Sequence, residues 1–322
     1  MQYFKMMVGL PGSGKSTAVD KKLKMANKID LSAEAVSTDT IREVLTGDAS
    51  DQTQNAKVFD IAKKAVVDLL NDGKSVVFDA TNVSSKYRVS FLSDIRRSVD
   101  SNRAITYTAH VMCTPIETCL AYNEKRAEDG GRFVPEDVIY RMMKQFQVPQ
   151  YFEGFDYINF DASNADILSS GESDLHDLSY RVGRNFDQNT PYHKYDLFTH
   201  CKKVAEQFDE NDVRHYAGYI HDVGKALTKV TDENGVSHYY SHENVGAYKL
   251  LSYLDYFTID NRPIDKDDVL EILFYVNYHM HIRDIIKSDK AISKYKKLWG
   301  EERFNKLVEF MEADNKASGR NK

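Results

Sequence analysis

The sequence has little cysteine and no long apolar run, and each absence excludes a class of protein. Its 322 residues include only 3 cysteines. They lack the CxxC spacing of a zinc or redox motif, so we expect reduced, structural thiols in a reducing compartment. No run approaches the roughly 18 apolar residues that span a bilayer, so we expect no membrane partner. Residues 1–8 lead directly into a glycine loop and do not resemble a signal peptide, which predicts a cytoplasmic location.

The chain also has no excess of positive charge. The formal net charge is -6, which argues against a broad basic face that coats nucleic acid. An enzyme that handles only a strand end needs a few well-placed basic side chains, so this class stays open. The length predicts two domains, each long enough to bury a core.

Two patterns divide the chain. In the first half, apolar runs alternate with helical stretches, as in a parallel α/β sheet with flanking helices. The runs are 3–8, 75–79, 104–111 and 157–160, and the helical stretches are 17–25, 58–70 and 135–146. After a polar segment, helical spacing recurs at 198–208, 212–227, 242–254, 267–279 and 301–314, with one candidate strand at 237–240. We therefore predict an α/β domain over 1–165, a connector over 166–188 and an all-α domain over 189–322.

A phosphate-binding loop follows the first apolar run. Residues 9–17 read GLPGSGKST and contain the pattern G-x-x-x-x-G-K-[ST] of P-loop NTPases. In such a loop, backbone amides surround the phosphates, the lysine reaches the β- and γ-phosphates, and the next hydroxyl ligates magnesium. The sequence therefore predicts ATP and Mg²⁺ as cofactors. The expected ligands are Gly9, Gly12, Ser13, Gly14, Lys15, Ser16 and Thr17, with Ser16 on the metal.

A second polar segment, Ser37-Thr38-Asp39-Thr40-Ile41-Arg42, lies where the next strand of such a fold should end. Ligands bind at that edge of a parallel sheet. An aspartate there can accept the proton of an attacking hydroxyl, and an arginine one helical turn later can bind a phosphate of the acceptor. The segment alone fits equally well an aspartate that caps a helix followed by a solvated arginine.

Together these motifs resemble the kinase domain of bacteriophage-type 5′-hydroxyl polynucleotide kinases over residues 1 to about 160. The resemblance extends to Asp79-Ala80-Thr81-Asn82, with Arg88 beyond it. It also includes an arginine-bearing lid, matched by Asn123, Arg126, Arg132 and the residues from 134 to 146.

The resemblance implies roles for four of these residues. Asp39 would be the general base for a 5′-hydroxyl, and Arg42 would contact the phosphate on the 3′ side of the acceptor. Arg126 and Arg132 would stabilise the transferring phosphoryl group. A surface salt bridge remains the alternative for each lid arginine. Asp79 could equally touch magnesium or serve as a structural acceptor.

Histidine is concentrated in the second half of the chain. Eight of the 10 histidines fall between His193 and His281. Imidazole and carboxylate groups that converge from separate helices form divalent-metal sites, and mixed nitrogen and oxygen ligation suits Mn, Fe, Co, Ni or Zn. An aspartate that follows a histidine, as in His221-Asp222, can bridge two metals.

This region resembles the HD superfamily of metal-dependent phosphohydrolases, and most nearly the HD domains of bacterial tRNA nucleotidyltransferases. The matching segments are 189–196 with His200, 217–225, 241–247, 278–280 and Asp314. The resemblance implies that His200, His221, Asp222 and Asp314 hold one metal, and that His242 and His279 hold a second metal or the substrate phosphate. Lys225 would pair with phosphate, helped by Arg320. His281 could replace His279, and His193 could face phosphate or order the first helix.

The two motif sets predict a bifunctional enzyme that heals nucleic-acid ends. An ATP-dependent 5′-hydroxyl kinase and a 2′,3′-cyclic phosphodiesterase or 3′-phosphatase would produce the ends that a ligase joins. The implied partners are RNA or DNA strand ends, such as broken tRNA, and an RNA ligase. In similar fusions the HD module comes first, whereas here it comes second. The alternatives are a nucleoside or small-molecule kinase fused to an HD nucleotide phosphohydrolase, and an RNA-binding adaptor with an inactive HD fold.

Overall fold

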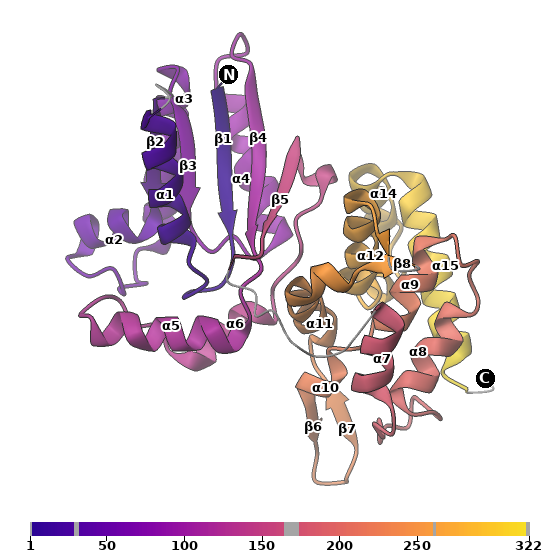
Figure 1. The fold of residues 1–322 in the computed structure, drawn as a ribbon. Coiled ribbons are helices and arrows are strands. Elements are labelled where there is room, and N and C mark those ends of the chain that lie inside the picture. Colours follow the sequence, from indigo (N-terminus) through magenta and orange to yellow (C-terminus); the bar gives the residue numbers. More distant parts are fainter. Residues whose placement is uncertain (1, 29–31, 164–173, 260–261, 320–322) are drawn as a thin grey trace. The chain divides into compact units, whose positions relative to one another are not determined.

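A computed structural model describes residues 2–28, 32–163, 174–259 and 262–319, drawn as a ribbon in Figure 1. The chain forms two compact units. The first comprises Met1–Met143 and Pro149–Asp166, and the second comprises Lys144–Val148 and Ile167–Lys322. No helix within the described ranges is both long enough and apolar enough to cross a bilayer.

The first unit is built on a five-stranded sheet in the order β2-β3-β1-β4-β5. Every neighbouring pair is parallel. The central strands are apolar and buried, with Phe4, Val77 and Ala109 fully covered, as expected when helices lie on both faces of a parallel sheet. The predicted α/β architecture is therefore confirmed. The strands are β1 (Gln2–Val8), β2 (Ala33–Ser37), β3 (Ser75–Asp79), β4 (Ile105–Met112) and β5 (Tyr157–Asp161).

Helices connect the strands, as parallel pairing requires. They are α1 (Lys15–Lys28), α2 (Thr38–Thr46), α3 (Asn55–Asn71), α4 (Ser85–Ser98), α5 (Ile116–Glu128), α6 (Glu136–Met143) and the 3₁₀ helix η1 (Tyr151–Glu153). The helix predicted at 135–146 is shorter than expected, because α6 ends at Met143. Phe146 continues the apolar spacing for another reason: its ring lies 4.9 Å from that of Tyr248, in the second unit.

The second unit is mainly helical. Its helices are α7 (Leu175–Gly183), α8 (Leu197–Ala205), α9 (Val213–Ile220), α10 (Lys225–Thr228), α11 (His242–Leu250), the 3₁₀ helix η2 (Leu251–Tyr256), α12 (Lys266–Tyr278), α13 (Ile282–Ile285), α14 (Asp289–Trp299) and α15 (Glu301–Ala317). The prediction of an all-α domain is wrong in detail, because two short antiparallel hairpins are present. They pair β6 (Lys229–Thr231) with β7 (Ser237–Tyr239), the strand expected at 237–240, and β8 (Thr258–Ile259) with β9 (Arg262–Pro263).

Part of the predicted connector is helical. Residues 164–173 lie outside the described ranges, but α7 falls within 166–188. Asp174 caps this helix by accepting from the amide of Asp177 at 2.9 Å. Leu175 and Leu178 are buried. The polar composition concealed α7, because its buried face is only a few residues wide.

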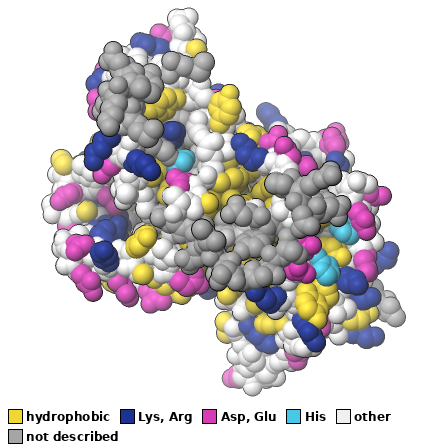
Figure 2. Space-filling view, in the orientation of Figure 1, with side chains coloured by type: hydrophobic (Ala, Val, Ile, Leu, Met, Phe, Trp, Pro, Cys, Tyr) yellow, Lys and Arg dark blue, Asp and Glu magenta, His cyan; other side chains and the backbone are white. Residues whose placement is uncertain are grey.

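Charged side chains of both signs are visible on one face of the molecule. On the face shown in Figure 2, basic side chains alternate with acidic ones and form no continuous basic area among the described residues. This agrees with the net charge of -6.

Candidate active sites

The predicted kinase residues lie at the carboxyl ends of three neighbouring parallel strands. β1 runs into the glycine loop, and α1 begins at Lys15. β2 ends at Ser37, two residues before Asp39, and β3 ends at Asp79. Because these strand ends share one edge of the sheet, the topology gathers a phosphate loop and two carboxylates in one place.

The glycine loop has a shape that requires glycine at position 12. The φ angle of Gly12 is 76°, and a Cβ there would lie 2.0 Å from the Cys119 carbonyl oxygen. The hydroxyl of Thr114 donates to the Ser13 carbonyl at 2.8 Å. The loop is therefore held by the chain itself in a left-handed turn that other residues adopt only with strain.

Lys15, Ser16 and Asp79 form the polar centre of the loop. The buried Lys15 ammonium donates to the carbonyls of Leu10 at 2.7 Å and Gly9 at 3.0 Å. Burial lowers the pKa of Lys15, and the Asp79 carboxylate opposes that shift. The Ser16 hydroxyl donates to Asp79 at 2.8 Å. A hydroxyl beside a carboxylate, next to the loop lysine, fits a nucleoside triphosphate with Mg²⁺, so Asp79 lies within the site.

Asp39 lies between two arginines. Arg42 donates to Asp39 Oδ1 at 2.7 Å, and Arg132 bonds to the same oxygen. The cap of α2 is Ser37, whose hydroxyl accepts from the Thr40 amide at 3.4 Å. Arg42 is only 4% exposed. The alternative of a capping aspartate with a solvated arginine is therefore wrong.

The last turn of α5 carries Arg126, and the segment between α5 and α6 carries Arg132. Arg126 donates to Asn123 Oδ1 at 2.9 Å. Asn123 holds the end of the segment by bonding to the Val134 carbonyl at 2.8 Å and the Val134 amide at 3.1 Å. The Arg132 side chain is 18% exposed and pairs with Asp39. Arg132 is therefore not in an isolated surface salt bridge.

The guanidinium groups retain unused donors. The Nε atoms of Arg42, Arg126 and Arg132 are buried and have no hydrogen-bond partner among the described residues. Burial, and then the neighbouring Arg132, lower the pKa of Arg126. Buried donors normally pair with acceptors, and planar guanidinium groups match phosphate oxygens. The arrangement therefore fits a transferring phosphoryl group.

Two arginines have structural partners that the sequence did not reveal. Arg42 also donates to Asn55 Oδ1 at 3.1 Å. Arg88 is fully buried and forms a two-hydrogen-bond ion pair with Glu153, at 2.6 and 2.7 Å. It also donates to the Asn82 carbonyl at 2.8 Å. Arg88 thus supports Asn82 and pairs with Glu153, and no described contact joins its side chain to the phosphate loop.

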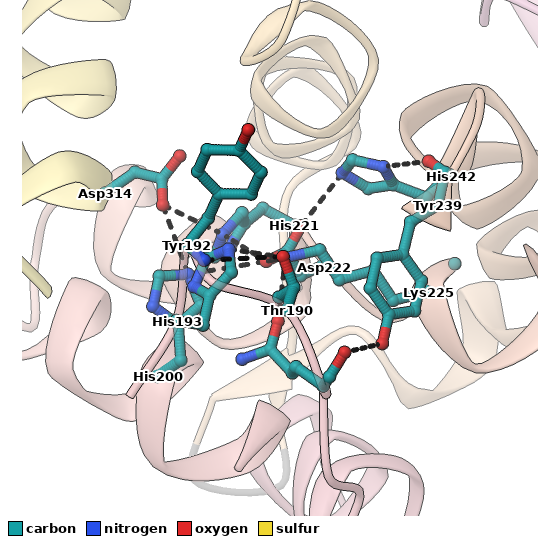
Figure 3. A network of polar contacts seen from close by, with 12 residues as sticks. Thr190, Tyr192, His193, His200, His221, Asp222, Lys225, Tyr239, His242 and Asp314 are labelled. Carbon is teal, nitrogen blue, oxygen red and sulfur yellow. Dashed lines mark hydrogen bonds and ion pairs between the residues drawn. The ribbon is translucent and has the colours of Figure 1, made fainter. Parts of the chain in front are cut away.

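The six predicted metal ligands of the second unit converge, and Figure 3 labels five of them. They come from different helices or from the turns that follow them. All six are buried. They are His200 on α8, His221 and Asp222 after α9, His242 at the start of α11, His279 after α12, and Asp314 on α15.

Asp222 lies between two pairs of histidines. Its Oδ2 lies 3.3 Å from Nε2 of His200 and 3.3 Å from Nε2 of His221. Its Oδ1 lies 3.0 Å from Nε2 of His242 and 3.6 Å from Nε2 of His279. Each carboxylate oxygen thus faces a different pair of ring nitrogens, an arrangement that fits a carboxylate bridging two cations.

Backbone carbonyls orient three of the rings. In His221, His242 and His279, Nδ1 lies 2.9, 2.8 and 2.9 Å from the carbonyl oxygen three residues earlier. A proton on Nδ1 leaves Nε2 free to bind a metal. The buried Nε2 atoms of His200 and His221 lie near carboxylate oxygens but form no hydrogen bond of regular geometry among the described residues. This donor set fits a divalent transition metal.

Asp314 lies with His200, His221 and Asp222, the ligands predicted for one metal. It is held by an arginine that the sequence did not point to. Asp314 Oδ1 lies 3.1 Å from His200 Nε2, and Arg283 donates to Oδ2 at 2.5 Å. Arg283 lies on the four-residue helix α13, which is too short to show a pattern. Burial alone would lower the pKa of His200, but its contacts with Asp222 and Asp314 raise the pKa to about 9.

Lys225 links Asp222 to two further polar side chains. Its ammonium lies 2.6 Å from Asp222 Oδ2, 2.9 Å from Gln188 Oε1 and 3.1 Å from His193 Nε2. Burial, and then the Lys225 ammonium, lower the pKa of His193 to about 3. Gln188 gave no signal in the sequence, because it falls in the predicted connector.

His281 does not join the cluster. Its Nε2 lies 3.1 Å from the Tyr295 hydroxyl, and its pKa is lowered by burial. The alternative in which His281 replaces His279 is therefore wrong for this structure. Arg320 lies outside the described residues.

Comparison with known proteins supports the description of the first unit. Residues 5–149 match a family model described as an AAA domain. The parallel sheet and the glycine loop of the first unit agree with this match to a P-loop domain. The transcription factor bHLH140 of Arabidopsis thaliana is 26% identical over 167 residues, which are 50% of this chain. The chain spans 16% of the length of that relative.

Solved structures resemble part of the chain at low identity. A chain in the structure of the Pnkp1/Rnl/Hen1 RNA repair complex is 24% identical with a TM-score of 0.38, over 45% of this chain and 43% of that chain. The APS kinase CysC of Mycobacterium tuberculosis is 18% identical with a TM-score of 0.38, over 49% of this chain and 88% of that chain.

Proposed function

We propose that the first unit transfers the γ-phosphoryl group of ATP to the 5′-hydroxyl of a nucleic-acid strand. The observation that carries the proposal is the position of Asp39, a carboxylate held by Arg42 and Arg132 at the strand edge that carries Lys15. Asp39 would accept the hydroxyl proton, and Lys15 and the lid arginines would hold the phosphoryl oxygens. Such positioning and charge placement account for most of the catalysis in phosphoryl transfer.

Transfer of radioactive phosphate from ATP to a 5′-hydroxyl oligonucleotide tests this proposal. We expect labelling by the wild-type protein and its loss in Asp39→Asn, which keeps the shape of the side chain but removes the base. Asp94→Asn, which removes a carboxylate paired on the surface with Lys63, is the matched control. Absence of label with the wild-type protein, or full activity of Asp39→Asn, would refute the assignment.

We further propose that the second unit is an HD-type phosphohydrolase that removes 2′,3′-cyclic phosphates or 3′-phosphates. Support comes from the two pairs of histidines on either side of Asp222 and from the buried Lys225 beside it. A bound divalent cation would supply a Lewis acid for phosphoester hydrolysis. Lys225 would hold a phosphate oxygen, and Asp222 and Asp314 would supply the negative charge that keeps the cations in place.

Hydrolysis of an RNA that ends in a 2′,3′-cyclic phosphate tests the second half of the proposal. With Mn, Co or Ni present, we expect conversion to a 3′-hydroxyl end, and loss of this activity in Asp222→Asn. The metal content of both proteins should be measured in parallel, since the variant should also lose metal. An RNA end that stays intact with all three metals would contradict the proposal.

Both proposed products are ends that a ligase joins, a 5′-phosphate and a 3′-hydroxyl. We therefore propose a broken RNA, such as a nicked tRNA, as the substrate and an RNA ligase as the enzyme that acts next. End-group analysis of a nicked tRNA anticodon loop after treatment would test both reactions on one molecule.

One observation favours a second candidate, a kinase for a nucleoside or another small molecule. Arg42, which would contact the acceptor's 3′-side phosphate, is buried and already bonds to Asp39 and Asn55. A small acceptor needs no such contact. Comparing a nucleoside with a 3′-phosphorylated nucleotide as acceptor separates the candidates, since only a polynucleotide kinase should prefer the second and lose that preference in Arg42→Ala.

A further inference from the structure

One segment of the second unit crosses the histidine–aspartate cluster and is anchored at both ends. The carbonyl of Asn189 accepts from the Ser237 amide of β7 at 2.8 Å. The Lys194 amide donates to the Ser318 carbonyl, just after α15, at 3.0 Å. The residues between these anchors, 190–193, form a tight turn in which the His193 amide lies 3.5 Å from the Thr190 carbonyl. The turn is therefore fixed before a substrate binds.

His193 presents a buried donor from this turn. Its ring centroid lies 4.5 Å from that of His200, and its Nε2 lies 3.1 Å from the Lys225 ammonium. An ammonium group can only donate, so Nε2 accepts and the ring proton is on Nδ1. Nδ1 is buried and has no hydrogen-bond partner among the described residues. It is a donor beside the predicted phosphate site, while Nε2 contacts the Lys225 ammonium.

Tyr192 presents an exposed ring from the same turn. It is 65% exposed, in contrast to the buried ligands, and Figure 3 shows its ring over the cluster in that view, next to His193. Exposed aromatic rings near a phosphate site are the groups on which nucleobases stack. The turn thus combines His193 Nδ1, a hydrogen-bond donor for an anion, with the aromatic ring of the preceding residue, Tyr192.

We propose that residues 190–193 form a nucleotide-recognition element, in which His193 Nδ1 donates to a phosphate oxygen and the Tyr192 ring stacks on the base that bears this phosphate. The inference rests on the proposed phosphohydrolase function and adds the class of substrate, a nucleotide unit rather than any phosphate ester. His193 and Tyr192 act here by binding and positioning the substrate.

Binding of two probes to the Mn²⁺-loaded full chain tests the proposal by calorimetry. The probes are inorganic phosphate and the 3′-methylenephosphonate analogue of uridine 3′-monophosphate, whose P–C bond the proposed phosphatase cannot hydrolyse. Base stacking is worth roughly 1–3 kcal/mol per base, so we expect the nucleotide to bind about 5- to 150-fold more tightly than phosphate. Tyr192→Leu should remove this advantage and Tyr192→Phe should keep it. Tyr157→Leu, at a 58% exposed tyrosine of the first unit, is the control.

Two substitutions at His193 distinguish the roles of its two ring nitrogens in binding. The amide nitrogen of asparagine lies near the position of Nδ1, and that of glutamine near Nε2. We expect His193→Gln to weaken the binding of both probes about 10-fold or more, as for a lost hydrogen bond to a charged group. His193→Asn should keep most of the wild-type affinity. The metal content should stay at the wild-type level in both variants.

The outcomes are distinct. Equal binding of the two probes by the wild-type protein, or an unchanged preference in Tyr192→Leu, would overturn the role of Tyr192. Loss of metal in both His193 variants, or equal affinities in them, would overturn the role of His193. A wild-type protein that binds neither probe would instead refute the phosphohydrolase proposal itself.

Discussion

The ion pair between Arg88 and Glu153 gives a prediction about what supports the kinase site. Both side chains are 0% exposed, and two hydrogen bonds of 2.6 and 2.7 Å join them. Glu153→Gln keeps the size of the side chain but leaves a buried guanidinium without its counter-charge. Removing one partner of a buried pair costs about 3–5 kcal/mol. For a unit of this size, that lowers the melting temperature by about 6–20 °C.

The single tryptophan makes the assay selective. Trp299 lies on α14 of the second unit, so its fluorescence follows the unfolding of that unit alone. We expect Glu153→Gln to lower the midpoint temperature of the unfolding transition seen by far-ultraviolet circular dichroism. The midpoint temperature of the fluorescence transition should not change. Glu34→Gln, which breaks an ion pair whose side chains are 38% and 48% exposed, should cost less than about 1 kcal/mol. The reasoning is refuted if the two variants are equally stable, or if the fluorescence transition falls as far as the circular dichroism transition.

Three further predictions concern the two sites. Gly12→Ala should abolish ATP binding in a filter assay, because its Cβ would lie 2.0 Å from the Cys119 carbonyl oxygen. Arg283→Ala should weaken metal affinity about 10- to 100-fold, measured by competition with a chelator, because Asp314 loses the donor at 2.5 Å that fixes its orientation; Arg283→Lys should recover part of it. In metal-free protein, His200 has a pKa raised to about 9, so its contribution to stability is complete below its ordinary pKa and is lost as the pH rises through 9. The urea midpoint of tryptophan fluorescence should therefore fall between pH 7 and pH 10, with a smaller fall once metal is bound.

The sequence was sufficient for features that depend on local pattern or fixed spacing. The run at 75–79 is β3 without change, and the phosphate loop lies between β1 and α1 as its motif requires. The histidines and aspartates of the second unit also converge as predicted, because each lies at the end or on the buried face of a helix with clear apolar spacing.

Features that depend on distant partners could not be predicted. Arg283 and Gln188 sit in short or polar segments, and their roles follow only from their contacts with Asp314 and Lys225. The burial of Arg42 follows from Asn55, which belongs to another helix. The helix predicted at 135–146 was too long, because Phe146 owes its apolar character to packing on Tyr248 in the second unit and not to α6. In each case the residue type is explained by a neighbour far away in the sequence.

The short segment Lys144–Val148 has a consequence for how this protein can be divided. The amide of Val148 donates to Asn277 at 2.8 Å, and Phe146 is fully buried. The second unit is therefore discontinuous in the sequence, because residues 144–148 precede β5, the last strand of the first unit. A single recombination joint in the polar segment near residue 166 would leave one module without five of its residues. Exchange of whole modules, or expression of either alone, would need two coordinated joints.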